Sequence, residues 1–147
     1  MNSLIFLDYD GVLHPIEAHH SRLFESADDL NFLLLPYPAV RLILSTSWVE
    51  WFGYERAKSS LPEPLRSRVI GTTVQDGSPR AREIVAEVKR RNPIAWLAID
   101  DNARDGWPIE LENNRFDTDP RKGLACRRRR QSLQIRLREH FGTFSSI

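Results

Sequence analysis

Two aspartates separated by one residue, Asp8 and Asp10, stand directly behind a short apolar run and directly before a glycine. The run at residues 4–7 is too short to cross a membrane and is typical of a buried strand in a parallel sheet. Gly11 allows the backbone to turn sharply after that strand. We therefore expect both carboxylates at the carboxyl end of a central strand, where open α/β sheets bind ligands.

Carboxylates this close together repel each other unless a cation lies between them. A hard cation that prefers oxygen ligands, such as Mg²⁺, fits this need. One carboxylate can then act as a nucleophile and form an aspartyl phosphate. The alternative is an ordinary turn at a strand end, where aspartate is common.

Two further apolar runs, at residues 40–44 and 95–99, also end in polar side chains. Because the carboxyl ends of parallel strands meet at one edge of a sheet, these side chains should join the two aspartates there. Hydroxyls and backbone amides can hold phosphate oxygens, and a second acidic pair can complete a magnesium site. The residues concerned are Ser45, Thr46 and Ser47 after the first run and Asp100 and Asp101 after the second.

A phosphoryl group also needs a positively charged partner. A helix predicted from Ser78, its cap, to about residue 91 has Pro79 at its first position and follows a strand, so it begins at the same edge. Arg80 and Arg82 lie in its first turn, whereas its other basic residues lie about 15 Å away at the far end. Arg80 is the preferred phosphate partner and Arg82 the second, with a solvated helix face as the alternative for both.

The elements that must position these groups follow from periodicity and from chain-breaking residues. Strands alternate with helices, which predicts a parallel sheet in a three-layer α/β fold with right-handed crossovers. A last helix over 127–141 repeats Leu133, Leu137 and Phe141 on its buried side. The other expected helices are 27–35, capped by Ser26, and one within 49–61; the expected strands are 4–7, 40–44, 69–70 and 95–99, with Phe116 in a short edge strand.

Composition bounds the class of protein. A chain of 147 residues with a net charge of +1 predicts a single domain over 1–147 and no overall field that would attract nucleic acid. The one cysteine, Cys126, excludes an internal disulfide framework and a cysteine-based zinc site. We see no signal peptide and no run long enough for a bilayer, so we expect a reducing, cytoplasmic location without membrane contact.

Taken together, the motifs resemble the haloacid dehalogenase (HAD) superfamily of phosphatases. The matching pieces, in the same order, are residues 8–12, the strand end at 45–47, Arg80, and Asp100 with Asp101. The finer pattern is similar to the capless HAD domains of RNA-repair ("Swiss army knife") proteins. Its pieces are Leu13-His14-Pro15, Ser45-Thr46-Ser47-Trp48, Arg80 followed by Glu83-Ile84, and Gly123-Leu124.

This resemblance implies a three-layer, Rossmann-like core without a cap domain. It also implies that Asp8 is the nucleophile and that Asp10 protonates the leaving oxygen and then activates water. Mg²⁺ is expected on Asp8, on the backbone carbonyl of Asp10, and on Asp100 or Asp101. Thr46 is expected to bind a phosphate oxygen, with Ser45 as the alternative in a register shifted by one. Arg80 takes a role that the family usually gives to lysine. The further expected substrate contacts are Ser47, Arg82 and His14.

Spacing bears on the substrate. The intervals 13–39 and 49–78 hold about thirty residues each, too few for a separate cap domain. We therefore expect a site that is open to solvent and to large phosphorylated substrates. The resemblance to capless HAD domains implies phosphoprotein or polynucleotide ends, or nucleotides, as substrates, and it also implies that a partner subunit could serve as the lid.

A basic cluster follows the last strand. We hypothesise that it contacts nucleic-acid phosphates, the alternative being a solvated, salt-bridged face. The cluster consists of Arg121, Lys122, Arg127, Arg128, Arg129 and Arg130.

Aromatic and histidine side chains leave alternatives open. Trp48 and Trp51 can stack on a base or pack over the sheet edge, and Trp107 can line the rim or the core. The pair His19-His20 can bind a metal or sit in a solvated loop.

The sequence thus favours a Mg²⁺-dependent phosphohydrolase, because every carboxylate of the motif is present. The rival is a non-catalytic phosphate-binding or scaffold module that keeps the fold. A phosphotransferase is a third possibility.

Overall fold

The computed structural model describes residues 2–142 of the chain. The strands are β1 (Ser3–Leu7), β2 (Val40–Leu44), β3 (Val69–Thr72), β4 (Ala95–Asp100) and β5 (Arg115–Asp117). The α-helices are α1 (Ala27–Leu34), α2 (Ser47–Phe52), α3 (Tyr54–Ser60), α4 (Leu65–Arg68), α5 (Arg80–Arg91) and α6 (Arg127–Phe141). Short 3-10 helices are η1 (His20–Arg22), η2 (Ile109–Asn114) and η3 (Gly123–Ala125).

The strands form one parallel sheet in the order β3-β2-β1-β4-β5, with β1 at its centre. The chain moves outward from β1 to β2 and β3, then returns to the other side of β1 for β4 and β5. This reversal lies between β1 and β4, and ligands of open α/β sheets bind at such a point. The topology therefore brings the ends of β1 and β4, which carry the aspartates, to the usual ligand crevice.

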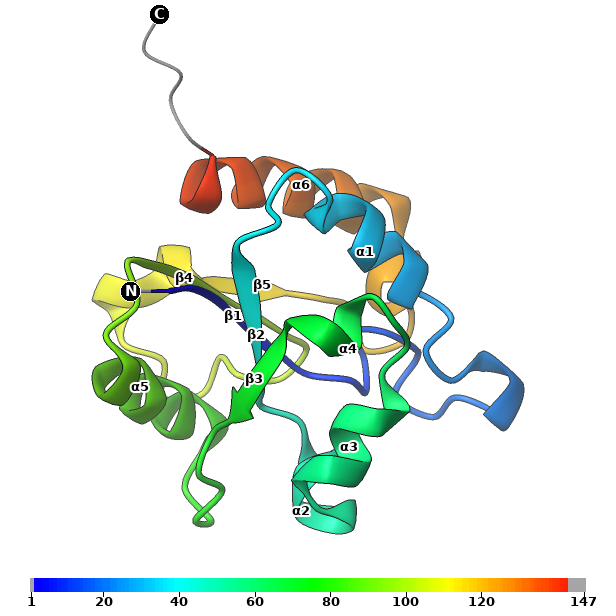
Figure 1. Ribbon diagram of the computed structural model, residues 1–147, viewed down its shortest axis with the longest axis horizontal. Helices are drawn as coiled ribbons and strands as arrows, with labels where there is room; N and C mark the ends of the chain where they lie inside the picture. The colour runs from blue at the N-terminus through cyan, green and yellow to red at the C-terminus, as the bar shows by residue number, and fades with distance from the viewer. Residues whose placement is uncertain (1, 143–147) are drawn as a thin grey trace, which may run out of the picture.

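Helices cover both faces of the sheet, as Figure 1 shows, with α1 and α6 on one face and α5 on the other. Side chains of β1 alternate between the two: Ile5 and Leu7 pack with α1 and α6, while Leu4 and Phe6 pack with α5. All four are fully or almost fully buried. A strand buried on both faces needs a continuous apolar sequence, which explains the run that precedes Asp8.

The three-layer α/β prediction is confirmed, and most of the predicted elements lie within a few residues of their expected bounds. Four details differ from the prediction. The helix expected within 49–61 is two helices, because Gly53 between α2 and α3 adopts a positive φ of 86°. Ser26 makes no capping hydrogen bond from its side chain, and α5 begins after Pro79 without a cap from Ser78. The short helix α4 was not predicted.

The intervals 13–39 and 49–78, at which a cap domain was considered, are part of this core. The first contains η1 and α1, and the second contains α3, α4 and β3. Apolar side chains of α3, α4 and β3 belong to the same hydrophobic cluster as those of α1 and α6. The domain is therefore capless, as expected. Within residues 2–142, no helix is both long enough and apolar enough to cross a membrane.

Candidate active site

Three carboxylates meet where β1 and β4 end. Asp8, Asp100 and Asp101 each offer an oxygen, and these oxygens all lie within 4.8 Å of one another. Asp8 and Asp100 are buried, and Asp101 is half-buried. The backbone N–H of Asn102 donates to Asp100 Oδ1 at 2.9 Å and fixes that carboxylate. We call these three residues the carboxylate cluster.

The turn after β1 leaves room for the cluster only because residue 11 is glycine. Gly11 has a φ of +78°, and a Cβ at this position would overlap the Asp101 carboxylate. A residue that follows β5 stabilises this turn, since the Thr118 hydroxyl donates to the Gly11 carbonyl at 2.6 Å. The Leu124 N–H donates to the carbonyl of Val12 at 2.8 Å. These contacts fix the direction in which the chain leaves β1.

Arg80, in the first turn of α5, reaches into the carboxylate cluster. Its Nη1 donates to Asp100 Oδ2 at 2.6 Å and lies 3.4 Å from Asp8 Oδ2. Its Nη2 donates to the Ser47 hydroxyl at 3.4 Å. Burial alone would lower the pKa of Arg80, but the charges of Asp100 and Asp8 raise it, so the guanidinium stays charged.

The surroundings of Asp8 disfavour its charged form. Burial raises the pKa of Asp8 well above its usual value, and the neighbouring charge of Asp100 raises it further against the opposing effect of Arg80. Burial also raises the pKa of Asp101. Three carboxylates and one guanidinium leave two uncompensated negative charges when all are ionised. The donor set of closely spaced carboxylate oxygens therefore fits a hard divalent cation such as Mg²⁺.

The side chain of Asp10 lies outside this cluster, and the metal contact expected of Asp10 is through its backbone carbonyl. Its carboxylate faces His14, whose Nε2 is 2.7 Å from Oδ1, and Trp48, whose Nε1–H donates to both oxygens at 3.2 Å. His14 is fully buried, so its ring supports Asp10 and does not face the pocket. The one-residue spacing thus separates the two aspartates into different environments.

The three hydroxyls after β2 differ in what they contact. The Thr46 hydroxyl accepts from the backbone N–H of Trp48 at 3.2 Å and caps α2. The Ser45 hydroxyl is fully buried and has no hydrogen-bond partner within the described part of the chain. Ser47 lines the pocket beside Arg80.

A pocket of about 620 Å³ opens over this edge of the sheet. It includes Trp51 and Ile16, both more than half exposed. Gln75, which was not predicted as a site residue, also lines the pocket, and its side-chain amide donates to the Thr46 carbonyl at 2.7 Å. Gln75 follows β3 closely, and polar side chains that follow β1, β2 and β4 lie at the same edge of the sheet, so its position along the chain could have indicated it. The remaining polar members of the lining include Glu50, Glu83, Asn102 and Asp105.

Several side chains considered from the sequence lie elsewhere. Arg82 borders a different pocket, between α5 and Pro108. Trp107 is buried, and its indole donates to the Leu111 carbonyl at 2.7 Å, so it belongs to the core. His19 and His20 are exposed and join no metal-ligand group that the described residues form.

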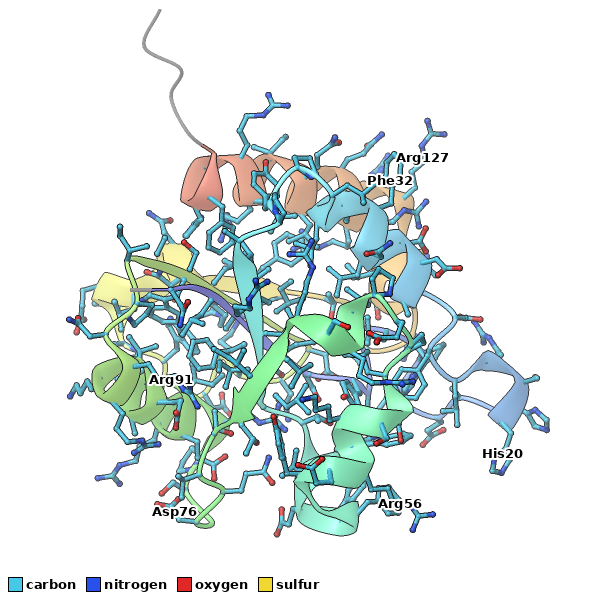
Figure 2. The ribbon with its side chains drawn as sticks, in the orientation of Figure 1. His20, Phe32, Arg56, Asp76, Arg91 and Arg127 are labelled. Carbon is cyan, nitrogen blue, oxygen red and sulfur yellow. The ribbon has the colours of Figure 1, made fainter. Side chains whose placement is uncertain are left out.

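The arginines at the start of α6 do not converge. Arg129 donates to the Asp117 carbonyl at 2.5 Å and lies over the Phe116 ring, and Arg130 donates to the carbonyls of Leu124 and Ala125. Figure 2 shows Arg127 at the opposite end of the molecule from Asp76, whose neighbours Gln75 and Gly77 line the pocket.

Comparison with known proteins gives one match. The model of a family described as the HAD domain in Swiss Army Knife RNA repair proteins matches residues 4–128, which include β1, β4, the carboxylate cluster and Arg80. No curated protein and no solved structure matches the chain. Both levels of the resemblance drawn from the motifs are confirmed. The chain belongs to the HAD domains of the Swiss Army Knife RNA repair type.

Proposed function

We propose that this protein is a Mg²⁺-dependent phosphohydrolase that works through an aspartyl phosphate on Asp8. The observation that carries the proposal is the convergence of Asp8, Asp100 and Asp101 on the Arg80 guanidinium beside an open pocket. A core without a ligand role has no reason to bury two carboxylates so close to a third, since their repulsion is unfavourable.

The residues divide the reaction between them. Asp8 attacks phosphorus, the bond from phosphorus to the leaving oxygen breaks, and Asp10 gives its proton to that oxygen. Water then attacks the phosphorus of the aspartyl phosphate, the bond from phosphorus to the Asp8 oxygen breaks to release phosphate, and Asp10 takes a proton from the water. Arg80 compensates the charge of the phosphoryl oxygens. Asp8, Asp100 and Asp101 would hold Mg²⁺, which when bound neutralises charge between the nucleophile and the phosphate.

We assign the phosphate-binding hydroxyl to Ser45 in preference to Thr46. The Thr46 hydroxyl is engaged in capping α2, whereas the Ser45 hydroxyl, on the strand beside that of Asp8, is buried and has no partner among residues 2–142. An unpaired buried hydroxyl costs free energy, which a ligand oxygen can recover. We expect Ser45→Ala to raise the KM for a phosphomonoester more than Thr46→Val does, since valine removes the Thr46 hydroxyl at nearly the same volume.

The pocket supports a phosphorylated nucleoside as the substrate unit, either free or at a polynucleotide end. Trp51 and Ile16 are 62% and 54% exposed where they line it, and an exposed indole can stack on a base. Trp51→Ala should raise the KM for a nucleoside monophosphate several-fold and leave the KM for glycerol phosphate unchanged. An equal change for both substrates would count against base stacking.

The deciding experiment is phosphate release with and without Mg²⁺, comparing the wild type with Asp8→Asn. Asp28→Asn, an exposed change on α1, is the matched control. The substrates are an aryl phosphate, nucleoside monophosphates, and oligonucleotides with 3′- or 5′-phosphates. Release that needs both Mg²⁺ and Asp8 supports the proposal. A folded protein that binds Mg²⁺ and releases no phosphate from any of them supports the rival, a non-catalytic phosphate-binding module.

A further inference from the structure

Asp10 is held by a group of side chains that the chemistry of the carboxylate cluster does not use. The indole of Trp48, in the first turn of α2, approaches both oxygens of Asp10, and the ring of His14 approaches only Oδ1. The side chain of Asp10 is about a quarter exposed, so one part of it still faces the pocket.

The proton of the His14 ring can be assigned from its second contact. The backbone N–H of Phe24 donates to His14 Nδ1 at 3.0 Å, so Nδ1 is an acceptor and carries no proton. In a neutral imidazole the proton is then on Nε2, which faces Asp10 Oδ1 at 2.7 Å. His14 therefore donates to Asp10.

Phe24 supplies its N–H from an unfavourable backbone conformation. Its φ is +60°, in the left-handed region that a large aromatic residue rarely adopts. The Phe24 ring packs edge-on against His14, Trp48 and Tyr9, with ring centroids 5.1 to 5.3 Å apart. Strain of this kind persists where surrounding packing imposes it, and it is concentrated at functional sites.

We propose that Phe24, His14 and Trp48 are positioning residues that hold Asp10 so that Oδ2 carries the catalytic proton. This inference rests on the proposed phosphohydrolase function. Oδ1 accepts from both His14 and Trp48, which uses its two lone pairs, while Oδ2, as far as the described residues go, accepts only from Trp48. Oδ2 thus keeps the free site. In the first step the Oδ2–H bond breaks as the leaving oxygen gains the proton, and in the second Oδ2 takes a proton from water.

The kinetic test uses the leaving group. The kcat/KM reports steps up to formation of the aspartyl phosphate, so it depends on leaving-group protonation. An alkyl phosphate needs that proton, and nitrophenyl phosphate, with its weakly basic leaving group, hardly does. We expect Trp48→Phe, which keeps the ring packing and removes the N–H, to lower kcat/KM for the alkyl phosphate about tenfold and for nitrophenyl phosphate less than twofold.

Matched variants separate positioning from general damage. Trp107→Phe removes an indole N–H that donates to the Leu111 carbonyl in the core, and it should leave the ratio of the two kcat/KM values unchanged. At His14, glutamine can still donate to Asp10 and leucine cannot. We therefore expect His14→Gln to keep most of the wild-type ratio of kcat/KM for the alkyl phosphate to kcat/KM for nitrophenyl phosphate. His14→Leu should lower this ratio about tenfold. Equal losses on both substrates in Trp48→Phe and His14→Leu would overturn the proposal.

A measurement without turnover separates this inference from the proposed function. Nitrogen-15 NMR of the wild-type histidine rings should show His14 protonated at Nε2 and unprotonated at Nδ1, and the Nε2–H resonance should shift in Asp10→Asn. A ring protonated at Nδ1 would refute the arrangement even in an active enzyme. The expected tautomer in a protein that hydrolyses nothing would support the geometry and leave only the proposed function rejected.

Discussion

The carboxylate cluster and the arginine run at residues 127–130 are both dense in like charge, but the fold treats them in opposite ways. The carboxylates converge to within 4.8 Å of one another around one guanidinium. Arg129 and Arg130 turn away from each other onto separate backbone carbonyls, and Arg127 and Arg128 point into solvent. Gathering like charges is unfavourable and is retained where a ligand of opposite charge compensates it. Convergence, and not charge density along the chain, therefore distinguishes the proposed binding site.

The largest expected effect is that of Asp8→Asn, which removes the proposed nucleophile and one of the converging charges. We expect kcat to fall by at least about a thousandfold. Because the surroundings of Asp8 favour its neutral form, the metal-free variant should also be more stable than the wild type, by about 1 kcal/mol. Phosphate release and chemical denaturation in a chelator measure the two effects. A less stable variant would mean that the Arg80 contact outweighs the carboxylate repulsion.

Gly11→Ala tests whether the cluster needs the space beside the β1 turn. The added methyl group would meet the Asp101 carboxylate in a backbone conformation with positive φ, so we expect a loss of about 3 kcal/mol. Gly106→Ala is the matched control, because Gly106 has a similar φ of +75° and open space around it. It should cost only about 1 kcal/mol. If chemical denaturation shows that the two variants lose the same free energy of unfolding, the contact with Asp101 does not explain the cost at residue 11.

Asp101→Asn tests the binding of metal directly. Saturating Mg²⁺ should stabilise the wild type by mass action, by about 2.7 kcal/mol at a hundredfold excess over its Kd. Loss of one carboxylate should weaken Mg²⁺ binding about tenfold, which lowers that stabilisation by about 1.4 kcal/mol. Asp105→Asn, in the pocket lining but outside the carboxylate cluster, should change neither the affinity for Mg²⁺ nor the stabilisation by Mg²⁺. Thermal unfolding during Mg²⁺ titration measures both variants.

In the arginine run, stability effects should be local and should differ between neighbours. Arg129→Gln loses the bond to the Asp117 carbonyl and the contact over Phe116, so we expect a loss of about 1 kcal/mol. Arg128 is exposed, and Arg128→Gln should change the free energy of unfolding by less than about 0.5 kcal/mol. Similar values for the two variants would mean that these contacts do not contribute to folding.

The smallest effect concerns nucleic acid. If only the exposed Arg127 and Arg128 meet phosphates, the logarithm of the affinity for a duplex DNA oligonucleotide should fall with the logarithm of salt concentration with a slope of about −1.8. Changing both to glutamine should abolish that slope. A slope near −3.6 would instead mean that all four arginines bind phosphates, which requires Arg129 and Arg130 to leave their carbonyls.

The strand ends and Arg80 could be predicted because they depend on rules that act along the chain. Apolar runs mark strands, parallel strands share an edge, and the helix after β3 must begin near that edge. The support of Asp10 could not be predicted in this way. Trp48 lies 38 residues from Asp10, and its indole N–H direction depends on how α2 packs. The Phe24 contact depends on a backbone angle that no sequence periodicity indicates.

The directions of the side chains in the arginine run could not be predicted for a related reason. Its spacing says that positive charges are close along α6, but a guanidinium on a long stem can turn toward any nearby carbonyl. The carbonyls of Asp117, Leu124 and Ala125 become available only in the folded molecule. Short side chains such as aspartate at a strand end have little such freedom, so their position in the sequence determines where their charge lies.

The hydrogen bond from Thr118 to the Gly11 carbonyl joins residues that are 107 positions apart. During synthesis the turn after β1 emerges well before Thr118, which follows only after β5 has been made. Contacts of such long sequence separation are slow to form. A nascent chain interrupted before residue 118 would therefore expose Asp8 without the hydrogen bond that completes its turn, and the carboxylate cluster should take its final form only once β5 has been made.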